Sequence, residues 1–211
     1  MENMTLTSLL KISIVIPILL VCSVVMVAYT LERFVAFLRI GRLDTATSER
    51  IKQCIRQGQV KDAIAMCNRK QNFITHALEV ALNAANFPRD EMESIFALYR
   101  MKLQGLLNRH LSIFGTLSFI APLLGLLGTV LGVIRAFRDL ALSGSGGPTI
   151  VAAGIAEALI ATAAGIAVAV TSAVLYNYFT TRLRSIVQQF DLLSQEVAIL
   201  VYTGHDKGDH R

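Results

Sequence analysis

The sequence lacks the side-chain combinations that catalysis, metal binding and nucleic-acid binding require. Cysteine occurs only at Cys22, Cys54 and Cys67, a spacing that fits no metal or redox motif. His76 and His110 stand alone in the sequence, which is typical of packed or surface histidines rather than ligands. The net charge is +5, but no compact basic, aromatic-rich stretch suits nucleic acid. We therefore predict no catalytic residue, no metal site, no cofactor and no nucleic-acid partner.

Charge is also scarce over long stretches. Hydrophobic residues make up 54 % of the 211 residues and the mean hydropathy is +0.55, which is too apolar for an ordinary soluble domain. Between Leu140 and Thr181 the one charged residue is Glu157. A spanning helix needs ~20 apolar residues. Residues 12–31, 111–134 and 149–179 meet this requirement, so the sequence predicts an all-α integral membrane protein with three transmembrane helices.

The first of these helices is predicted from about Leu9 to Leu38. A signal peptide is disfavoured because the stretch is long, follows a single basic residue and has no small-residue cleavage site. Residues 39–109 then carry twelve Lys or Arg against seven Asp or Glu. By the positive-inside rule this segment is cytoplasmic and the N-terminus lies outside. Cys54 and Cys67 are then expected to be reduced thiols in a packed core.

The polar segment predicts short helices. Residues 48–57 and 59–70 are separated by Gly58, and residues 73–86 end before Pro88. Asp90 is a candidate helix cap. The following apolar pattern is helical without interruption, so we predict one helix from Glu91 to Leu140, ~75 Å long. Because the bilayer core takes ~30 Å, the rest of this helix would project into the cytoplasm.

The third helix also outlasts the membrane. Tyr176 and Tyr178 suit an interfacial aromatic belt, and Arg182 marks the cytoplasmic side. An apolar stripe continues at helical spacing to Val201, so this helix too extends into the cytoplasm. The predicted organisation is a first transmembrane helix with a short outer N-terminus in residues 1–40, a cytoplasmic helical domain in 41–90, a stalk helix plus second span in 91–140, an outer turn in 141–150, the third span plus cytoplasmic helix in 151–203, and a disordered tail in 204–211.

Small residues line the second and third spans, and polar groups lie among them. Small stripes allow membrane helices to approach closely. The residues assigned to this packing are Pro122, Gly125, Gly128, Gly132, Gly154, Ala158, Ala161 and Gly165. If Leu140 and Val151 lie at equal depth, then Thr129 and Thr162 share one level, ~16 Å below the outer face. Two hydroxyls with Glu157 above them suggest a polar path.

Close packing alone remains an alternative to this polar path. Thr129 could bond its own backbone one turn earlier. Thr162 and Glu157 are ~140° apart around their helix, so they cannot both face the centre of one narrow surface. An ionisable residue that lies inside a membrane usually marks an ion path, because a charge costs ~2.5–3.5 kcal/mol or more at mid-depth. The protonation state of Glu157 is left open.

Four motifs resemble the MotA/TolQ/ExbB proton-channel family, and ExbB and TolQ in particular. They are Leu31-Glu32-Arg33-Phe34, residues 121–132 (APLLGLLGTVLG), residues 155–165 (IAEALIATAAG) and Tyr176-Asn177. The resemblance implies a cyclic homopentamer around a dimer of a single-span, ExbD/TolR-like subunit whose aspartate carries the proton. It assigns the pore threonines to Thr129 and Thr162 and the pore glutamate to Glu157.

The resemblance further implies an inner-membrane motor with a periplasmic N-terminus and a cytoplasmic C-terminus. Proton motive force would energise outer-membrane transport or another envelope process, with a TonB/TolA-like protein as a further possible partner. The coupling ion is expected to be H⁺ rather than Na⁺. The alternatives are a passive membrane scaffold, a self-sufficient channel and, least favoured, a membrane enzyme. Internal inverted repeats, which are typical of small transporters, are not seen in the sequence.

Overall fold

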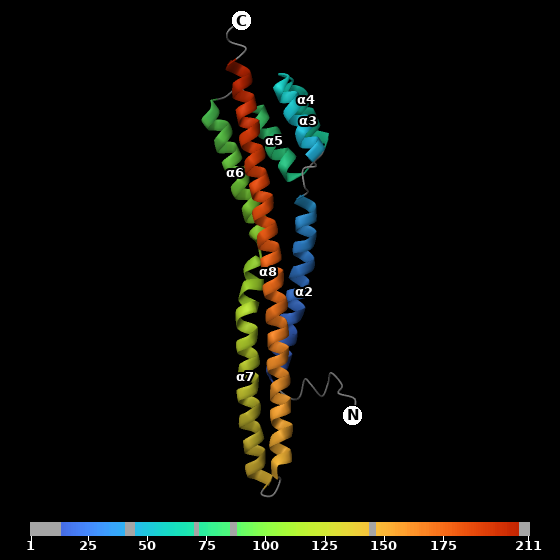
Figure 1. Ribbon diagram of the computed structural model, residues 1–211, viewed down its shortest axis with the longest axis vertical. Helices are drawn as coiled ribbons and strands as arrows, with labels where there is room; N and C mark the ends of the chain where they lie inside the picture. The colour runs from blue at the N-terminus through green and yellow to red at the C-terminus, as the bar shows by residue number, and fades with distance from the viewer. Residues whose placement is uncertain (1–13, 41–44, 70–71, 85–87, 144–146, 207–211) are drawn as a thin grey trace. The chain divides into compact units, whose positions relative to one another are not determined.

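The computed structural model describes residues 14–40, 45–69, 72–84, 88–143 and 147–206. All regular structure in these ranges is α-helical (Figure 1). The helices are α2 (Val15–Ile40), α3 (Thr45–Arg56), α4 (Val60–Arg69), α5 (Phe73–Asn83), α6 (Arg89–Asn108), α7 (Leu111–Ser143) and α8 (Gly147–Asp206). Three helical stretches are long and apolar enough to cross a membrane: Val15–Ile40, Arg89–Leu142, which contains α6 and α7, and Val151–Thr203. The predicted all-helical class and its three membrane-length helices are confirmed.

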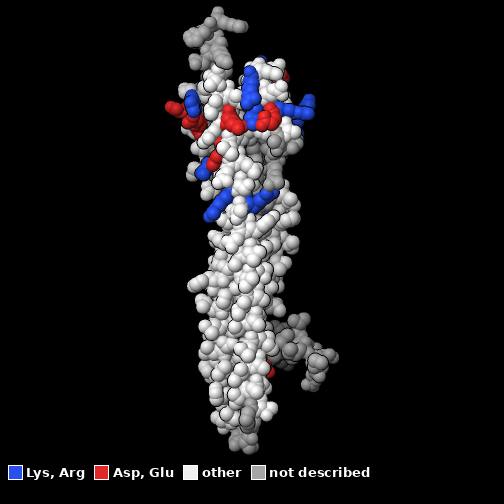
Figure 2. All heavy atoms as spheres, in the orientation of Figure 1, with Lys and Arg blue, Asp and Glu red and all other residues white. Residues whose placement is uncertain are grey.

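The chain divides into two compact units. The first unit comprises Met1–Glu32 and His110–Phe179, and in the described residues it contains most of α2, all of α7 and the first half of α8. Its outer surface carries large apolar side chains, with Phe119 72 % exposed and Leu142 76 % exposed. The face shown in Figure 2 is almost free of charge over these helices. Such a surface is suited to lipid, because water would penalise it.

The second unit comprises Arg33–Arg109 and Thr180–Arg211. Its core includes the buried side chains of Ile51, Leu78 and Phe190. Charged side chains gather on its surface (Figure 2), and some of them connect its helices. Lys52 Nζ of α3 donates to Glu196 Oε2 of α8 at 2.8 Å, and hydrogen bonds to Glu196 and Glu49 raise the Lys52 pKa. The second unit therefore combines an apolar core with a water-compatible surface.

A groove of about 580 Å³ lies between α6 and α8 in the second unit. Phe96 and Phe190 line it, and its rim carries Arg100 and Asp191. Arg100 Nε donates to both carboxylate oxygens of Asp191 at 2.9 Å. A second rim pair joins Arg89 to Glu93 at 2.6 Å. Because these charges are satisfied within the unit, the groove offers no evident attraction for a charged ligand.

The prediction of one helix from Glu91 to Leu140 is wrong. Helix α6 ends at Asn108 and α7 begins at Leu111. His110 between them has φ +62°, and it is the one residue other than glycine with positive φ among those described. This left-handed conformation costs an L-residue ~1–2 kcal/mol. The sequence does not reveal this break, because apolar residues recur at helical spacing both before and after residues 109–110.

Other helix ends differ from their predicted positions by a few residues. Helix α6 begins at Arg89 and its N-cap residue is Pro88, so Asp90 is not the cap. Asp90 lies in the first turn, where its negative charge interacts favourably with the positive end of the helix dipole. Helix α5 ends at Asn83, three residues before the predicted end. Helix α8 continues to Asp206, so the first three residues of the predicted disordered tail are helical. The first predicted helix included residues 9–13, which lie outside the described residues, as do 207–211.

One sequence signal located a short-range feature correctly, and one local feature was missed. Gly58 separates α3 from α4 with φ +75°, a conformation that glycine adopts without a Cβ clash. The N-terminus of α5 has a reciprocal cap in which the Thr75 amide donates to Asn72 Oδ1 at 2.8 Å. Asn72 was not singled out from the sequence, although Asn and Thr three residues apart are compatible with such a cap.

Cys67 should react slowly with thiol reagents in the folded protein. Its side chain is 2 % exposed, and burial raises its pKa from 9.0 to about 11. At pH 8 the thiolate fraction should therefore be about a hundredfold lower than in the unfolded chain. Iodoacetamide labelling followed by peptide mass spectrometry, with and without denaturant, measures this ratio.

The same pKa shift predicts a pH dependence of stability. A thiol whose folded-state pKa is raised contributes stability below pH 9 and loses it as the pH rises towards 11. Cys67→Ala should remove this dependence. Equal labelling rates with and without denaturant would contradict the buried, neutral thiol.

Candidate functional site

Helices α7 and α8 pack with their backbones almost in contact. A β-carbon placed on Gly165 would lie 2.6 Å from the Ala121 carbonyl oxygen and 2.9 Å from Gly125 Cα. A β-carbon on Gly132 would lie 2.6 Å from the Ala158 Cβ atom. Real β-carbons do not approach other atoms so closely, so these positions require glycine at this helix separation. Close contacts of the same kind occur at Gly125, Gly128 and Gly154.

These contacts fix the antiparallel register. Gly125 faces Thr162, Gly132 faces Ala158 and Gly154 faces Ala136. Glu157 thus lies close to the level of Val133. Thr162 packs on Gly125 rather than directly opposite Thr129, which places the two threonines about one turn, ~6 Å, apart along the helix axis.

Both threonine hydroxyls donate to carbonyl oxygens of α7. Thr162 Oγ1 donates across the helix interface to the Gly125 oxygen at 3.0 Å. Thr129 Oγ1 donates within its own helix to the Leu126 oxygen at 2.6 Å. The two acceptors belong to consecutive residues, so the hydroxyls lie on neighbouring carbonyls. Each hydroxyl oxygen retains lone pairs that can accept a hydrogen bond from water or from a protonated group.

Helix α2 packs on one flank of the α7–α8 pair. Gly128 of α7 approaches Val15, whose Cβ lies 3.5 Å from a β-carbon placed on the glycine. Ser172 Oγ of α8 lies 3.0 Å from Met26 Sδ. Val15 and Leu19 form a buried cluster with residues of α7 and α8, and Ala164 and Val168 are partly buried against it.

The threonines and Glu157 face opposite flanks. Counted around α8 from Ser172 at ~100° per residue, Thr162 lies ~80° to one side and Glu157 ~60° to the other. Ala164 lies seven residues after Glu157, about two turns, and therefore shares its side, which is the side of α2. Around α7, Gly128, which approaches Val15, lies ~60° to one side of Gly125, and Thr129 lies ~40° to the other. The two hydroxyls thus lie on the side of the helix pair away from α2, and the carboxylate lies on the side of α2.

Glu157 is exposed, and charged residues of α7 lie near the same flank. Arg135 lies seven residues after Gly128 and so occupies the same face, and both Arg135 and Arg138 are exposed. The predicted site did not include these arginines. The signal was present in the sequence, since Arg135 and Arg138 are the first charges after the long neutral stretch of the second span.

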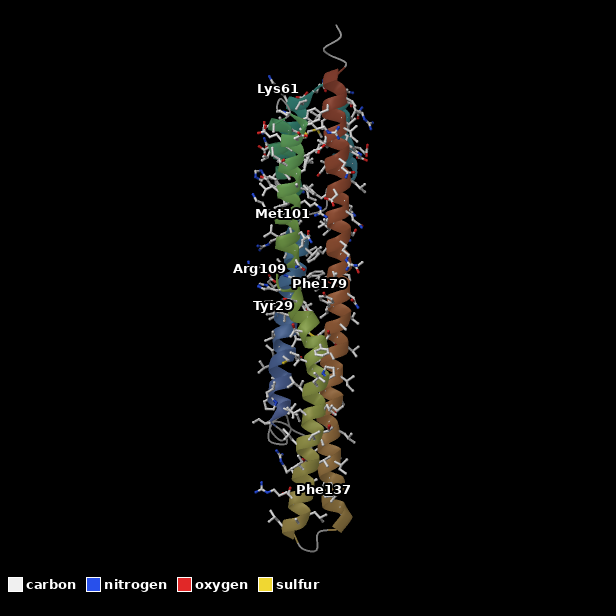
Figure 3. All side chains as sticks on the ribbon, turned by 90° about the vertical axis from the view of Figure 1, so that its left-hand side faces the viewer. Tyr29, Lys61, Met101, Arg109, Phe137 and Phe179 are labelled. Atoms are coloured by element: carbon white, nitrogen blue, oxygen red, sulfur yellow. The ribbon has the colours of Figure 1, made fainter. Side chains whose placement is uncertain are left out.

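At the other end of the first unit, His110 does not stand alone, as the sequence suggested. Its Nδ1 lies 3.4 Å from Glu32 Oε2, and its ring centroid lies 4.8 Å from that of Tyr29. Phe179 packs on Phe114 with ring centroids 5.7 Å apart. Tyr29 and Phe179 are labelled in Figure 3. Sequence reasoning missed this cluster because 78 residues separate Glu32 from His110.

The adjacent Arg33 is buried although it is charged, with 3 % of its surface exposed. Its Nη1 donates to the Leu106 oxygen at 3.0 Å and to the Leu107 oxygen at 3.4 Å. These carbonyls belong to the last turn of α6, where intrahelical partners run out. Arg33 therefore caps the C-terminal end of α6.

The fold and this geometry define a multi-pass helical membrane protein whose close-packed helix pair carries hydroxyls and a carboxylate. The sequence model of the MotA/TolQ/ExbB proton channel family matches residues 65–192, which include both threonines and Glu157. The chain belongs to this family.

Individual relatives agree with the family assignment. The chain is 30 % identical over 161 residues to the biopolymer transport protein ExbB of Pseudomonas putida, covering 72 % of this chain and 49 % of that protein. It is 37 % identical over 103 residues to the Tol-Pal system protein TolQ of Haemophilus influenzae, covering 48 % and 44 %. It is 34 % identical over 96 residues to TolQ of Pseudomonas aeruginosa, covering 46 % and 42 %. The chain spans about half the length or less of these relatives.

Adding one methyl group at the α7–α8 interface should destabilise the protein. In Gly165→Ala the new Cβ would meet backbone atoms of Ala121 and Gly125, which cannot rotate away. We expect the free energy of unfolding to fall by about 1–3 kcal/mol, which is typical when an extra carbon is forced into a packed interface. Gly105→Ala is the matched control, because a β-carbon there meets nothing within 4 Å. It should be neutral or stabilising by ~0.5–1 kcal/mol.

Thermal unfolding of the purified protein in mild detergent measures both variants. A Gly165→Ala protein as stable as the Gly105→Ala protein would contradict the close approach of α7 and α8.

Proposed function

We propose that this chain is the proton-channel subunit of an ExbB/TolQ-like motor in the inner membrane. The observation that carries the proposal is the pair of hydroxyls, Thr129 and Thr162, on one flank of the glycine-packed α7–α8 pair. Both lie in apolar helices of membrane length. Membership of a proton-channel family supports a proton as the transported ion.

In this proposal the threonine flank faces a pore. The opposite flank is covered by α2. A ring of five copies would then place Thr129 and Thr162 around a lumen that holds two helices of an ExbD/TolR-like partner. The hydroxyl lone pairs would solvate or relay a proton beside the partner's membrane carboxylate. Such a partner is physically sensible because, among the described residues of α7 and α8, the threonine flank offers hydroxyls but no titratable group of its own.

Glu157 would act differently from the threonines. It lies nearer the outer end of α8 and on the other flank, so it is not positioned to pass a proton directly to Thr162. We propose that it shapes the electrostatic field near the outer mouth, where Arg135 and Arg138 also lie. This assigns Glu157 an electrostatic rather than a relay role in the motor.

The distribution of charge supports one orientation in this proposal. The second unit carries most of the charged residues, and the positive-inside rule would place it in the cytoplasm together with the C-terminus, leaving the N-terminus in the periplasm. The cytoplasmic parts of α6 and α8 would form a stalk. Proton flow would drive movement of the partner and energise outer-membrane transport or another envelope process, with a TonB/TolA-like protein as a further partner.

A passive membrane scaffold is the alternative. The Thr129 hydrogen bond to its own helix supports it, because that bond is what ordinary packing requires. A scaffold needs neither hydroxyl to face water, and it would tolerate Glu157→Gln.

The assembly state gives the first test. Co-expression with an ExbD/TolR-like single-span protein should yield a complex of five copies of this chain and two of the partner. Native mass spectrometry in mild detergent measures the stoichiometry directly. A monomer or dimer that retains no such partner would contradict the motor and favour the scaffold.

Removal of the Thr162 hydroxyl gives the second test. In Thr162→Val the bond to the Gly125 oxygen is lost with little change of shape, and proton flux through vesicles containing the complex should fall about tenfold or more, equivalent to ~1.4 kcal/mol or more in the barrier. Thr162→Ser keeps a hydroxyl and should retain most of the flux. A pH-sensitive dye inside the vesicles reports the rate.

Thr171→Val is the matched control for this series. Thr171 is also a threonine of α8, and its hydroxyl bonds its own helix at the Ala167 oxygen. Flux in this variant should match the unmodified complex. Glu157→Gln should lower the flux without abolishing assembly. Equal flux in Thr162→Val and Thr171→Val would exclude a pore role for Thr162.

A further inference from the structure

The proline in the middle of α7 removes one backbone hydrogen bond from this membrane-length helix. Pro122 lies inside α7 and has no amide hydrogen. In an uninterrupted helix the amide of residue 122 would donate to the Ser118 oxygen, four residues earlier. The Ser118 carbonyl therefore lacks the donor that a helix normally supplies. In a bilayer such a carbonyl needs another donor, because the hydrocarbon around the helix offers none.

The Ser118 side chain adds a second acceptor at the same turn. Its hydroxyl donates to the Gly115 oxygen at 2.8 Å, so the hydroxyl proton is engaged within α7. The hydroxyl oxygen keeps lone pairs that can accept a hydrogen bond. Ser118 and Pro122 are both half-buried in the single chain, so neither is sealed in a core. This turn thus offers two oxygen acceptors, one from the side chain and one from the backbone.

These acceptors lie on the same face of α7 as Thr129. Ser118 precedes Pro122 by four residues, and Thr129 follows Pro122 by seven, which is about two turns. Counted around the helix from Gly125, the three residues lie ~20°, ~60° and ~40° to one side. Gly128, which approaches α2, lies ~60° to the other side. The threonine flank therefore continues past Pro122 towards the N-terminal end of α7.

The hydroxyls on this flank are prepared to accept rather than to donate. Thr129 and Thr162 give their protons to carbonyl oxygens of α7, and Ser118 does the same. A row of oxygens whose own protons are engaged favours a ligand that donates. Protonated water is such a ligand, because all of its hydrogens donate and its positive charge strengthens each bond. The flank therefore favours protonated water over neutral water.

We propose that Ser118, with the carbonyl that Pro122 leaves free, forms a binding site for water and in particular for protonated water. The site lies about two turns, ~10 Å, along α7 from the Gly125 oxygen to which Thr162 donates. A short file of waters spans this distance. Pro122 acts here through the amide that it lacks rather than through helix packing alone. The inference rests on the proposed function, because the proton reaches this site along the threonine flank.

Pro122→Ala tests the site because it restores an amide donor to the Ser118 oxygen. The variant should be at least as stable as the unmodified protein, since proline disfavours a helix interior. Proton flux through vesicles containing the complex should nevertheless fall about twofold to tenfold, the effect of withdrawing one hydrogen-bond acceptor. If the proline had only a structural role, its replacement would change stability and flux in the same direction.

Ser118→Ala removes the hydroxyl and should lower the flux by a similar factor. Thr116→Val is the matched control, because the Thr116 hydroxyl also bonds its own helix, at the Ser112 oxygen, but lies ~160° around α7 from Ser118. Its flux should equal that of the unmodified complex. Loss of flux in Thr162→Val without loss in Ser118→Ala and Pro122→Ala would overturn the inference and leave the proposed function standing. Unchanged flux in all three of these variants would contradict both.

Hydration of the carbonyl provides a check that does not depend on flux. Ser118-Phe119 is the one Ser–Phe pair in the sequence, so isotope labels on serine carbonyl carbon and phenylalanine nitrogen select a single peptide bond. Solid-state NMR of the protein assembled in lipid vesicles measures how fast magnetisation passes from water protons to this carbonyl. The transfer should be faster in the unmodified protein than in Pro122→Ala, where the restored amide occupies the oxygen. Equal transfer rates would overturn the water site whatever the flux.

Discussion

The near-contact of the α7 and α8 backbones is the constraint on which the membrane part of this structure depends. Glycines at the crossing positions leave no room for a β-carbon, and the helices interlock in a single register. That register brings Thr162 onto the Gly125 carbonyl and fixes which side of the pair each polar group occupies. A larger residue at Gly165 would separate the helices and displace the Thr162 hydroxyl from its acceptor.

The distribution of polar groups follows from the cost of exposing them to lipid. The hydroxyls of Thr129 and Thr162 donate hydrogen bonds to backbone oxygens, so placing them in a low-dielectric medium costs little free energy. Glu157 has no such solution within its helix, and an ionised carboxylate facing hydrocarbon costs ~2.5–3.5 kcal/mol or more at mid-depth. Its exposure on the single chain is therefore consistent with an assembly in which another subunit, a partner or water covers it.

The C-terminal end of α2 contains a sequence motif whose side chains make specific contacts. Residues 31–34 were singled out only as part of a family resemblance. In the structure Arg33 caps α6 through two carbonyls, and Glu32 lies beside His110. These contacts give a physical reason for the charged pair at the end of an apolar helix.

The sequence by itself determined the helical class, the three membrane-length helices and the break at Gly58, because each depends on local composition, periodicity or backbone freedom. The assumption that Leu140 and Val151 lie at equal depth also predicted the α7–α8 register to within about one turn. Only the tertiary structure decided the break at His110, the burial of Arg33, and that α2 covers the flank of Glu157 rather than the flank of the threonines. Each of these depends on contacts between residues far apart in the chain, or on which flank α2 covers, and helical periodicity carries no information about either.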